Sequence, residues 1–119
     1  MKLEDLQVYR LSMQVGEEIW RIVHRWGHFE KDTVGKQLVR AADSIAANLS
    51  EGHGRFHFQE NKHFCYISRA SLQETLTWLE KAHQRNLIPS EDYAALLNDI
   101  CTLKVKLNRY IQSIGKNSR

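Results

Sequence analysis

The sequence has little of what a β-rich, disulfide-bonded or membrane-spanning protein needs. Its 119 residues include one proline, six glycines and two cysteines, and the β-branched alternation typical of strands is absent. No run of about 18 apolar residues occurs, so no membrane-spanning segment is expected. Cys65 and Cys101 stand apart without a Cys-x-x-Cys pair, which favours reduced thiols over a disulfide framework.

The composition and the first residues favour one globular domain inside the cell. Hydrophobic residues make up 42% and charged residues 26% of the chain, which is typical of a globular chain long enough to bury a core. The opening MKLEDLQVYR carries acids where a signal peptide would have its apolar segment. We therefore expect a single domain over residues 1–119 and a cytoplasmic location.

The sequence contains no motif that predicts an enzyme. A nucleophile elbow, a phosphate-binding loop and a dinucleotide fingerprint are all missing. His53, His57 and His63 lie close in sequence, but no His-Glu-x-x-His pattern joins them and the cysteines lack ligand spacing. We expect no catalytic residue, no cofactor and no metal site.

Glycine and proline divide the chain into four segments with helical periodicity. The short connections between them make successive helices antiparallel neighbours. The sequence therefore predicts an all-α, antiparallel up-down four-helix bundle. The predicted helices run from about Glu4 to Trp26, from Asp32 or Thr33 to Gly52, from Gln59 to Arg85, and from Ser90, as N-cap after Pro89, to Gly115.

The last two segments each show one clear packing face. In the third segment Ser68, Ser71 and Ala82 lie on the apolar face, where small side chains let a neighbouring helix approach closely. The fourth segment has apolar residues spaced alternately three and four apart, which is the pattern of a helix-packing seam. That seam consists of Tyr93, Leu96, Ile100, Leu103, Leu107, Tyr110 and Ile114.

The first segment carries two apolar stripes roughly 120° apart around the helix. One comprises Leu6, Tyr9, Met13, Gly16, Trp20 and Val23, and the other comprises Val8, Leu11, Val15, Ile19, Ile22 and Trp26. Because one helix cannot turn both stripes into one core, we expect the second to meet another subunit, with Val15 and Ile22 at the contact. The alternative is a wide core-facing arc with a few exposed apolar residues.

A polar stripe lies beside the apolar face of the second segment. It comprises Gln37, Arg40, Ser44, Asn48 and Glu51, and Arg55 follows two glycines later. Arginine and asparagine side chains suit a phosphate or the backbone of a partner. The structural alternative is that Glu51 pairs with an arginine and that Asn48 caps a neighbouring element, so that the stripe fixes an interface.

Positive charge is concentrated in the second half of the chain. Residues 1–60 hold 8 Lys/Arg and 9 Asp/Glu, a net of −1, whereas residues 61–119 hold 9 and 5, a net of +4. No acid follows Asp99. The basic residues after it could attract phosphates, or could form a solvated face that complements a helix dipole; they are Lys104, Lys106, Arg109, Lys116 and Arg119.

Basic and aromatic residues also alternate around the second break. Arg55 precedes Phe56 and Phe58, and Lys62 precedes Phe64; such a mixture can stack bases and neutralise phosphates. The simpler interpretation places Phe64 in the core and uses Phe56 to anchor the loop. Both interpretations stay open at the level of sequence.

The chain resembles the family of 23S rRNA intervening-sequence proteins over almost its whole length, and three stretches between residues 3 and 74 carry the resemblance. They are LEDLQVYRLSMQV, VGKQLVRAADSIAANLSEGHGR and FCYISRASLQE. The loop HFEKDTVGKQL lacks the proline that this family often has there. The family's characteristic polar positions fall on Arg40, Ser44, Asn48, Glu51, Arg55 and Glu74.

The resemblance implies a four-helix bundle that assembles as a pentameric ring with a central channel. It also implies contact with RNA or DNA, or with a nucleic-acid-processing protein, as for the related accessory proteins of diversity-generating retroelements. We therefore expect a non-enzymatic, ring-forming homo-oligomer without membrane association. The alternative is a structural or protein-binding scaffold without nucleic-acid activity.

Overall fold

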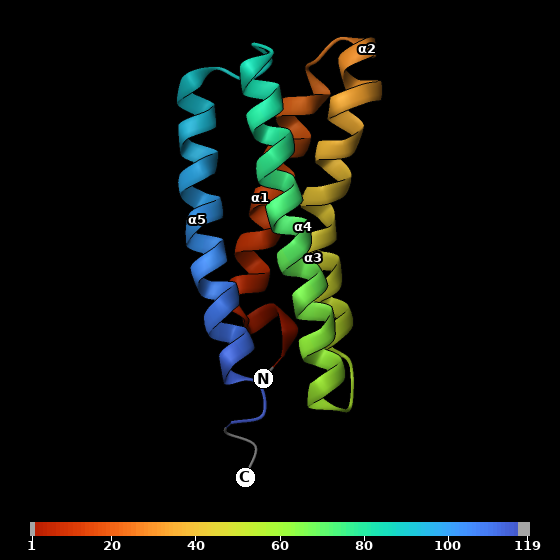
Figure 1. Ribbon diagram of the computed structural model, residues 1–119, viewed down its shortest axis with the longest axis vertical. Coiled ribbons are helices and arrows are strands. Elements are labelled where there is room, and N and C mark those ends of the chain that lie inside the picture. The colour runs from red at the N-terminus through yellow and green to blue at the C-terminus, as the bar shows by residue number, and fades with distance from the viewer. Residues whose placement is uncertain (1, 117–119) are drawn as a thin grey trace.

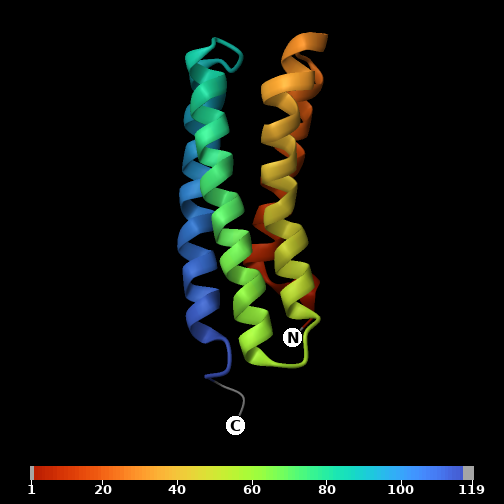
Figure 2. The ribbon, with the colours of Figure 1, turned by 45° about the vertical axis from the view of Figure 1, so that its right-hand side comes forward.

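The computed structural model describes residues 2–116, and these form an up-down bundle of four long helices without a strand. Figures 1 and 2 show successive long helices running in opposite directions. The predicted all-α fold is therefore confirmed. The elements in order are η1 (Leu3–Asp5), α1 (Gln7–His24), α2 (His28–Glu30), the π-helical η2 (Lys31–Gly35), α3 (Lys36–His53), α4 (Phe58–Gln84) and α5 (Ser90–Ser113).

The four long helices are arranged so that each has two neighbours. Helix α1 packs on α3 and α5, and α4 packs on the same two helices from the opposite corner. The α1–α3 and α4–α5 faces are consequently opposite sides of a body that measures 51 × 24 × 20 Å. None of the described helices combines the length and the apolar character needed to cross a bilayer.

Helix α5 contributes the packing seam that its spacing predicts. Leu96, Ile100, Leu103 and Leu107 are buried against the other helices. Tyr93 and Tyr110, which lie on the same seam nearer the two ends of the helix, are half-buried. The phenol oxygen of Tyr110 lies 3.4 Å from the side-chain nitrogen of Asn61 on α4. Hydrophobic burial at the alternating spacing thus determines which side of α5 faces inward.

Helices α3 and α4 pack more closely than any other pair, and small or hydroxylated residues make this possible. The buried Ser68 hydroxyl on α4 donates a 2.8 Å hydrogen bond to the Ile45 carbonyl on α3. The Ser44 and Ser71 hydroxyl oxygens are 2.8 Å apart across the same seam. These bonds satisfy polar groups that would otherwise be costly to bury.

Several predicted helix boundaries are wrong. The second helix begins at His28 rather than at Asp32 or Thr33, and it continues through the π-helical turn into α3. Thr33 is therefore an interior residue, and its hydroxyl donates to the Phe29 carbonyl. Ser90 is the first residue of α5 and Pro89 takes the N-cap position; the Ser90 hydroxyl instead lies 3.3 Å from His83 Nε2.

The remaining ends lie close to their predicted positions. Helix α3 continues to His53 with Gly54 as its C-cap. Helix α5 stops at Ser113, and Gly115 follows with a positive φ of 86°. Arg119, which the sequence placed in the basic tail, lies outside the described residues.

The predicted subunit contact through Val15 and Ile22 is also wrong. Both side chains belong to the core of the chain itself, with only 2% and 7% of their surfaces exposed. The second apolar stripe of α1 points between α3 and α5, while Met13 and Trp20 of the first stripe stay 46% and 54% exposed. The second stripe therefore fills the core, and the first stripe borders solvent at Met13 and Trp20.

We predict that Gly52→Ala lowers stability and that Gly54→Ala does not. A Cβ at the buried Gly52 would lie 2.9 Å from the Asn61 backbone oxygen on α4, whereas a Cβ at the exposed Gly54 would meet nothing closer than 3.7 Å. Overpacking of this kind costs about 1–3 kcal/mol, against about 1 kcal/mol that alanine gains over glycine in a helix. Urea denaturation at one protein concentration should give a lower midpoint for Gly52→Ala alone. Equal midpoints for the two variants would show that the α3–α4 contact tolerates a methyl group.

Candidate interaction surface on helices α1 and α3

Arg55 does not form an open phosphate site in this structure. Its guanidinium donates a 2.7 Å hydrogen bond to the Glu51 carboxylate and lies 4.8 Å from the centre of the Phe64 ring. Both members of the ion pair are largely exposed, so the pair adds little stability. It does hold Arg55 against the C-terminal end of α3, as the structural interpretation of Glu51 predicts.

The cations of α5 point in two directions. Lys106 donates a 2.9 Å hydrogen bond to the side-chain oxygen of Gln7 on α1, and Arg109 lines a small groove beside it. Lys104 lies about 140–160° around α5 from both, at 3.6 residues per turn, on the side that packs towards α4. The predicted basic tail is therefore two separate sites rather than one patch.

Arg40 lies near the beginning of α3, at the opposite end of the helix from Arg55. Lys62 is half-buried in the first turns of α4, near the α3–α4 turn that carries Arg55. The structure thus does not bring the six predicted cations together. Arg40 is the one that shares a groove with further cations that the sequence analysis did not single out.

The polar stripe serves mainly to join α3 to α4. The Asn48 side-chain nitrogen donates 2.9 Å hydrogen bonds to the carbonyl and the hydroxyl of Ser44, and Ser44 in turn contacts Ser71. Glu74 accepts a 3.0 Å hydrogen bond from the indole nitrogen of Trp78, one turn further along α4. None of these groups forms an open site for a ligand.

The titratable groups inside the bundle do not assemble into a metal or nucleophilic centre. Among residues 2–116, no three His, Cys, Asp or Glu side chains are placed to hold a metal ion. His53 Nδ1 lies 3.4 Å from the Tyr110 hydroxyl, while His57 and His63 pack edge-on against Phe56 and Phe64. Burial raises the pKa of the Cys65 thiol to about 11, which makes it a poor nucleophile at neutral pH.

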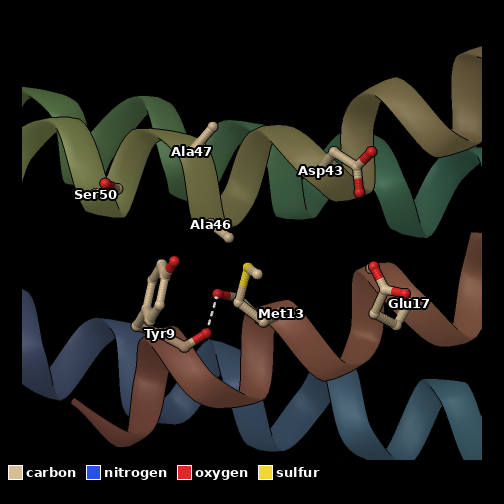
Figure 3. A pocket seen from close by; sticks show the side chains of 9 residues that line it. Tyr9, Met13, Glu17, Asp43, Ala46, Ala47 and Ser50 are labelled. Carbon is tan, nitrogen blue, oxygen red and sulfur yellow. Dashed lines mark hydrogen bonds between the residues drawn. The ribbon is translucent and has the colours of Figure 1, made fainter. Parts of the chain in front are cut away.

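Two adjoining grooves lie on the α1–α3 face. The first, which we call the acidic groove, has a volume of about 510 Å³ and is shown in Figure 3. Glu17 of α1 and Asp43 of α3 lie opposite each other at one end of it, and Met13 points towards Ala46 across the middle. The full lining is Tyr9, Ser12, Met13, Gly16, Glu17, Asp43, Ala46, Ala47 and Ser50.

The two carboxylates of the acidic groove influence each other. A Cβ on Gly16 would lie only 3.0 Å from an Asp43 carboxylate oxygen, so the glycine lets this acid lie against α1. Partial burial raises the pKa of Asp43 above its ordinary 3.8, and the negative charge of Glu17 raises it further. The groove therefore favours a cation or a proton over an anion.

The second groove, which we call the basic groove, has a volume of about 330 Å³ and continues the same face beyond Trp20. Its walls are apolar at the bottom and carry positive charge at the mouth. Gly35 of η2 sits directly on α1, because a Cβ there would lie 2.7 Å from the Val23 side chain. The lining consists of Trp20, Val23, His24, Lys31, Gly35, Lys36, Val39 and Arg40.

Sequence reasoning identified Arg40 but missed the rest of this surface. Trp20 and Met13 were assigned to a core stripe, and Lys31 and Lys36 were not singled out. Two signals were present in the sequence: aromatic and methionine side chains in one stripe are typical of interfaces, and Trp20 and His24 are spaced to stack on one helix face. The contribution of η2 could not be found, because nothing local to that segment indicates a π-helical turn.

Together these features define a small all-α bundle with two grooves and exposed apolar side chains on its α1–α3 face. The model of the 23S rRNA-intervening sequence protein family matches residues 4–109. The chain belongs to this family. No curated protein matches the sequence.

A solved structure supports the same fold. It is a protein of unknown function from the S23 ribosomal protein family of Bacteroides thetaiotaomicron, and it superimposes with a TM-score of 0.83. The match covers 95% of this chain and 100% of that chain at 24% sequence identity. At that identity the likeness concerns the fold.

We predict that Asp43→Asn raises stability at neutral pH and has a smaller effect near pH 3. Because the pKa of Asp43 is higher in the folded chain than its ordinary 3.8, folding favours the protonated carboxyl. Its contribution to stability therefore falls as the pH rises through the folded pKa, and asparagine avoids that loss. Urea denaturation of both proteins at pH 3 and pH 7 measures the difference. An equal effect at both pH values would mean that the groove does not perturb this acid.

Proposed function

We propose that this protein is a non-enzymatic interaction module that assembles with itself and binds nucleic acid or a nucleoprotein partner. The observation that carries the proposal is the distribution of exposed apolar side chains over opposite faces of the bundle, next to cations. The free thiols of Cys65 and Cys101 suit a reducing cytoplasm as its location.

Self-assembly is supported by two unlike faces. Met13, beside the acidic groove, is 46% exposed on the α1–α3 face, and Tyr66 and Val105 are 46% and 49% exposed on the α4–α5 face. Arg69 links the latter two helices, because it lies over the Tyr66 ring and donates a hydrogen bond to Asn108. A contact between two different faces is head-to-tail and closes into a ring where the rotation permits; the family resemblance favours five subunits.

Nucleic-acid binding is supported by the charges that the fold leaves at the surface. Lys104 and Arg109 are exposed on α5, and Arg40 is exposed at the mouth of the basic groove. Phosphate attraction by several such side chains is sequence-independent and strongly salt-dependent. No described histidine or acid cluster offers a rival metal-dependent chemistry.

The alternative function is a structural or protein-binding scaffold. It is favoured by the partners that two predicted cations already have, namely Glu51 for Arg55 and Gln7 for Lys106. A scaffold would use the apolar faces and leave phosphate unbound. A measurement of nucleic-acid binding at low salt distinguishes the two functions.

We predict that the protein in solution has a mass several times 13.9 kDa, and five times that mass for the expected pentamer. Val105→Glu should dissociate the assembly, because it puts a charge on an exposed apolar side chain of the α4–α5 face. Thr102→Glu is the matched control, since it puts the same charge on an exposed residue of α5 elsewhere. Light scattering over a range of concentrations measures the mass. A 13.9 kDa species at every concentration would refute assembly, and an unchanged mass in Val105→Glu would exclude that face.

We predict that structured RNA or single-stranded DNA binds at low salt, with a log–log salt slope of about −0.7 for each phosphate neutralised on a single strand. Replacing Lys104, Lys106 and Arg109 together by glutamine should weaken binding and flatten the slope, because each removes a positive charge. Fluorescence anisotropy with labelled oligonucleotides measures both quantities. Absence of binding below roughly 50 mM salt, where screening is weak, would favour the scaffold.

A further inference from the structure

The basic groove combines an exposed indole with an apolar floor. Trp20 is 54% exposed, and its ring lies within 15° of parallel to the imidazole of His24. Val23 and Val39 form the bottom of the groove beneath this edge. A flat, largely apolar group can therefore lie against Trp20 and cover the valines.

Three cations surround this apolar floor, and the fold leaves them without partners. Lys31, Lys36 and Arg40 line the groove. Within the described part of the chain, no side-chain hydrogen bond or ion pair engages any of them, unlike Arg21 and Arg55, which pair with nearby acids. Their charges are consequently available to an anionic ligand.

The π-helical turn explains why two of these lysines lie together. On an α-helix, residues five apart are separated by about 140°, so Lys31 and Lys36 would point to different sides. In a π-helical turn the repeat is i to i+5, which brings both to the same groove. Gly35 completes the arrangement, because its missing side chain lets η2 rest on Val23 and Trp26.

The acidic groove adjoins the basic groove and marks where the positively charged surface ends. Asp43 lies one turn beyond Arg40 on α3, and Glu17 lies one turn before Trp20 on α1. These carboxylates repel phosphate, so that an anionic strand is favoured beside Lys31, Lys36 and Arg40 and disfavoured along the rest of the face.

We propose that the basic groove is a binding site for single-stranded nucleic acid, in which one base stacks on Trp20 and the adjoining phosphates contact Lys31, Lys36 and Arg40. This inference rests on the proposed nucleic-acid binding and assigns it to one place. A single strand is the occupant because its base faces are free to stack, whereas a duplex hides them between neighbouring pairs. The cations would attract the phosphates, and the indole would stack on the base.

The test measures binding of a fluorescein-labelled twelve-residue oligothymidylate to the full chain by anisotropy, from about 50 mM salt upward. Trp20→Ala should weaken binding by roughly 5- to 150-fold, the range for loss of one stacked base, with the salt slope unchanged. Trp20→Phe should bind nearly as tightly as wild type, because a phenyl ring also stacks. Lys36→Gln combined with Arg40→Gln should weaken binding and reduce the slope by about 1.4.

The matched control is the double variant Lys106→Gln, Arg109→Gln, which removes the same charge from α5. Under the proposal it loses less affinity than the Lys36, Arg40 double variant. Light scattering on each variant checks that its mass is that of wild type. If Trp20→Ala changes the mass, the affinities of the two double variants are compared instead, and they decide whether the basic groove is the binding site.

Three outcomes would overturn the assignment while leaving nucleic-acid binding in place. The first is wild-type affinity in both Trp20→Ala and the Lys36, Arg40 double variant. The second is a larger loss in the α5 double variant. The third is displacement of the oligothymidylate by a twelve-residue polyglutamate that is added at the same concentration of negative charge. That result would show that the groove recognises charge without stacking, and it would favour an acidic protein partner. Failure of wild type to bind any oligonucleotide would instead refute the proposed function itself.

Discussion

The close contact between α3 and α4 is the constraint on which the rest of the bundle depends. It needs Gly52 at one end, where a side chain would meet the backbone of α4, and serines along its length. The Ser68 hydroxyl donates to a carbonyl of α3, and Ser44 meets Ser71. Leucine and isoleucine side chains from all four long helices fill the core beside this seam. Val15 and Ile22 of α1 belong to that core, whereas Trp20 stays at the surface.

The same constraint determines which flank of α3 stays exposed beside α1. Helix α3 is fixed to α4 through one flank and presents its other flank, with Val39, Arg40 and Asp43, beside α1. This face is divided by charge, because Asp43 and Glu17 occupy one groove and the three cations occupy the next. An interaction surface with both signs and an exposed indole in between is suited to orienting a ligand as well as attracting it.

The sequence predicted the four helices and the α5 seam because hydrophobic periodicity is a local signal. It failed at α1, where two stripes are equally apolar and the choice between them depends on the positions of α3 and α5. It also failed at the start of the second helix. Asp32 and Thr33 are good N-cap residues, so the sequence alone places the helix start there. The contact of Gly35 with Val23 and Trp26 exists only in the folded chain and could not be read from local sequence. The basic groove follows from that same tertiary contact, so the sequence singled out Arg40 and carried a signal for Trp20, but nothing in it indicated that Lys31 and Lys36 lie beside them.

The most direct test of this account is ¹⁹F NMR of the protein labelled with 5-fluorotryptophan, recorded while single-stranded DNA is added. The chain has three tryptophans, and they sample different environments: Trp20 is exposed in the basic groove, Trp26 packs against the core, and Trp78 donates a hydrogen bond to Glu74 on α4. The account predicts that the Trp20 resonance shifts or broadens first while that of Trp78 stays in place. A response at Trp78 with none at Trp20 would contradict it.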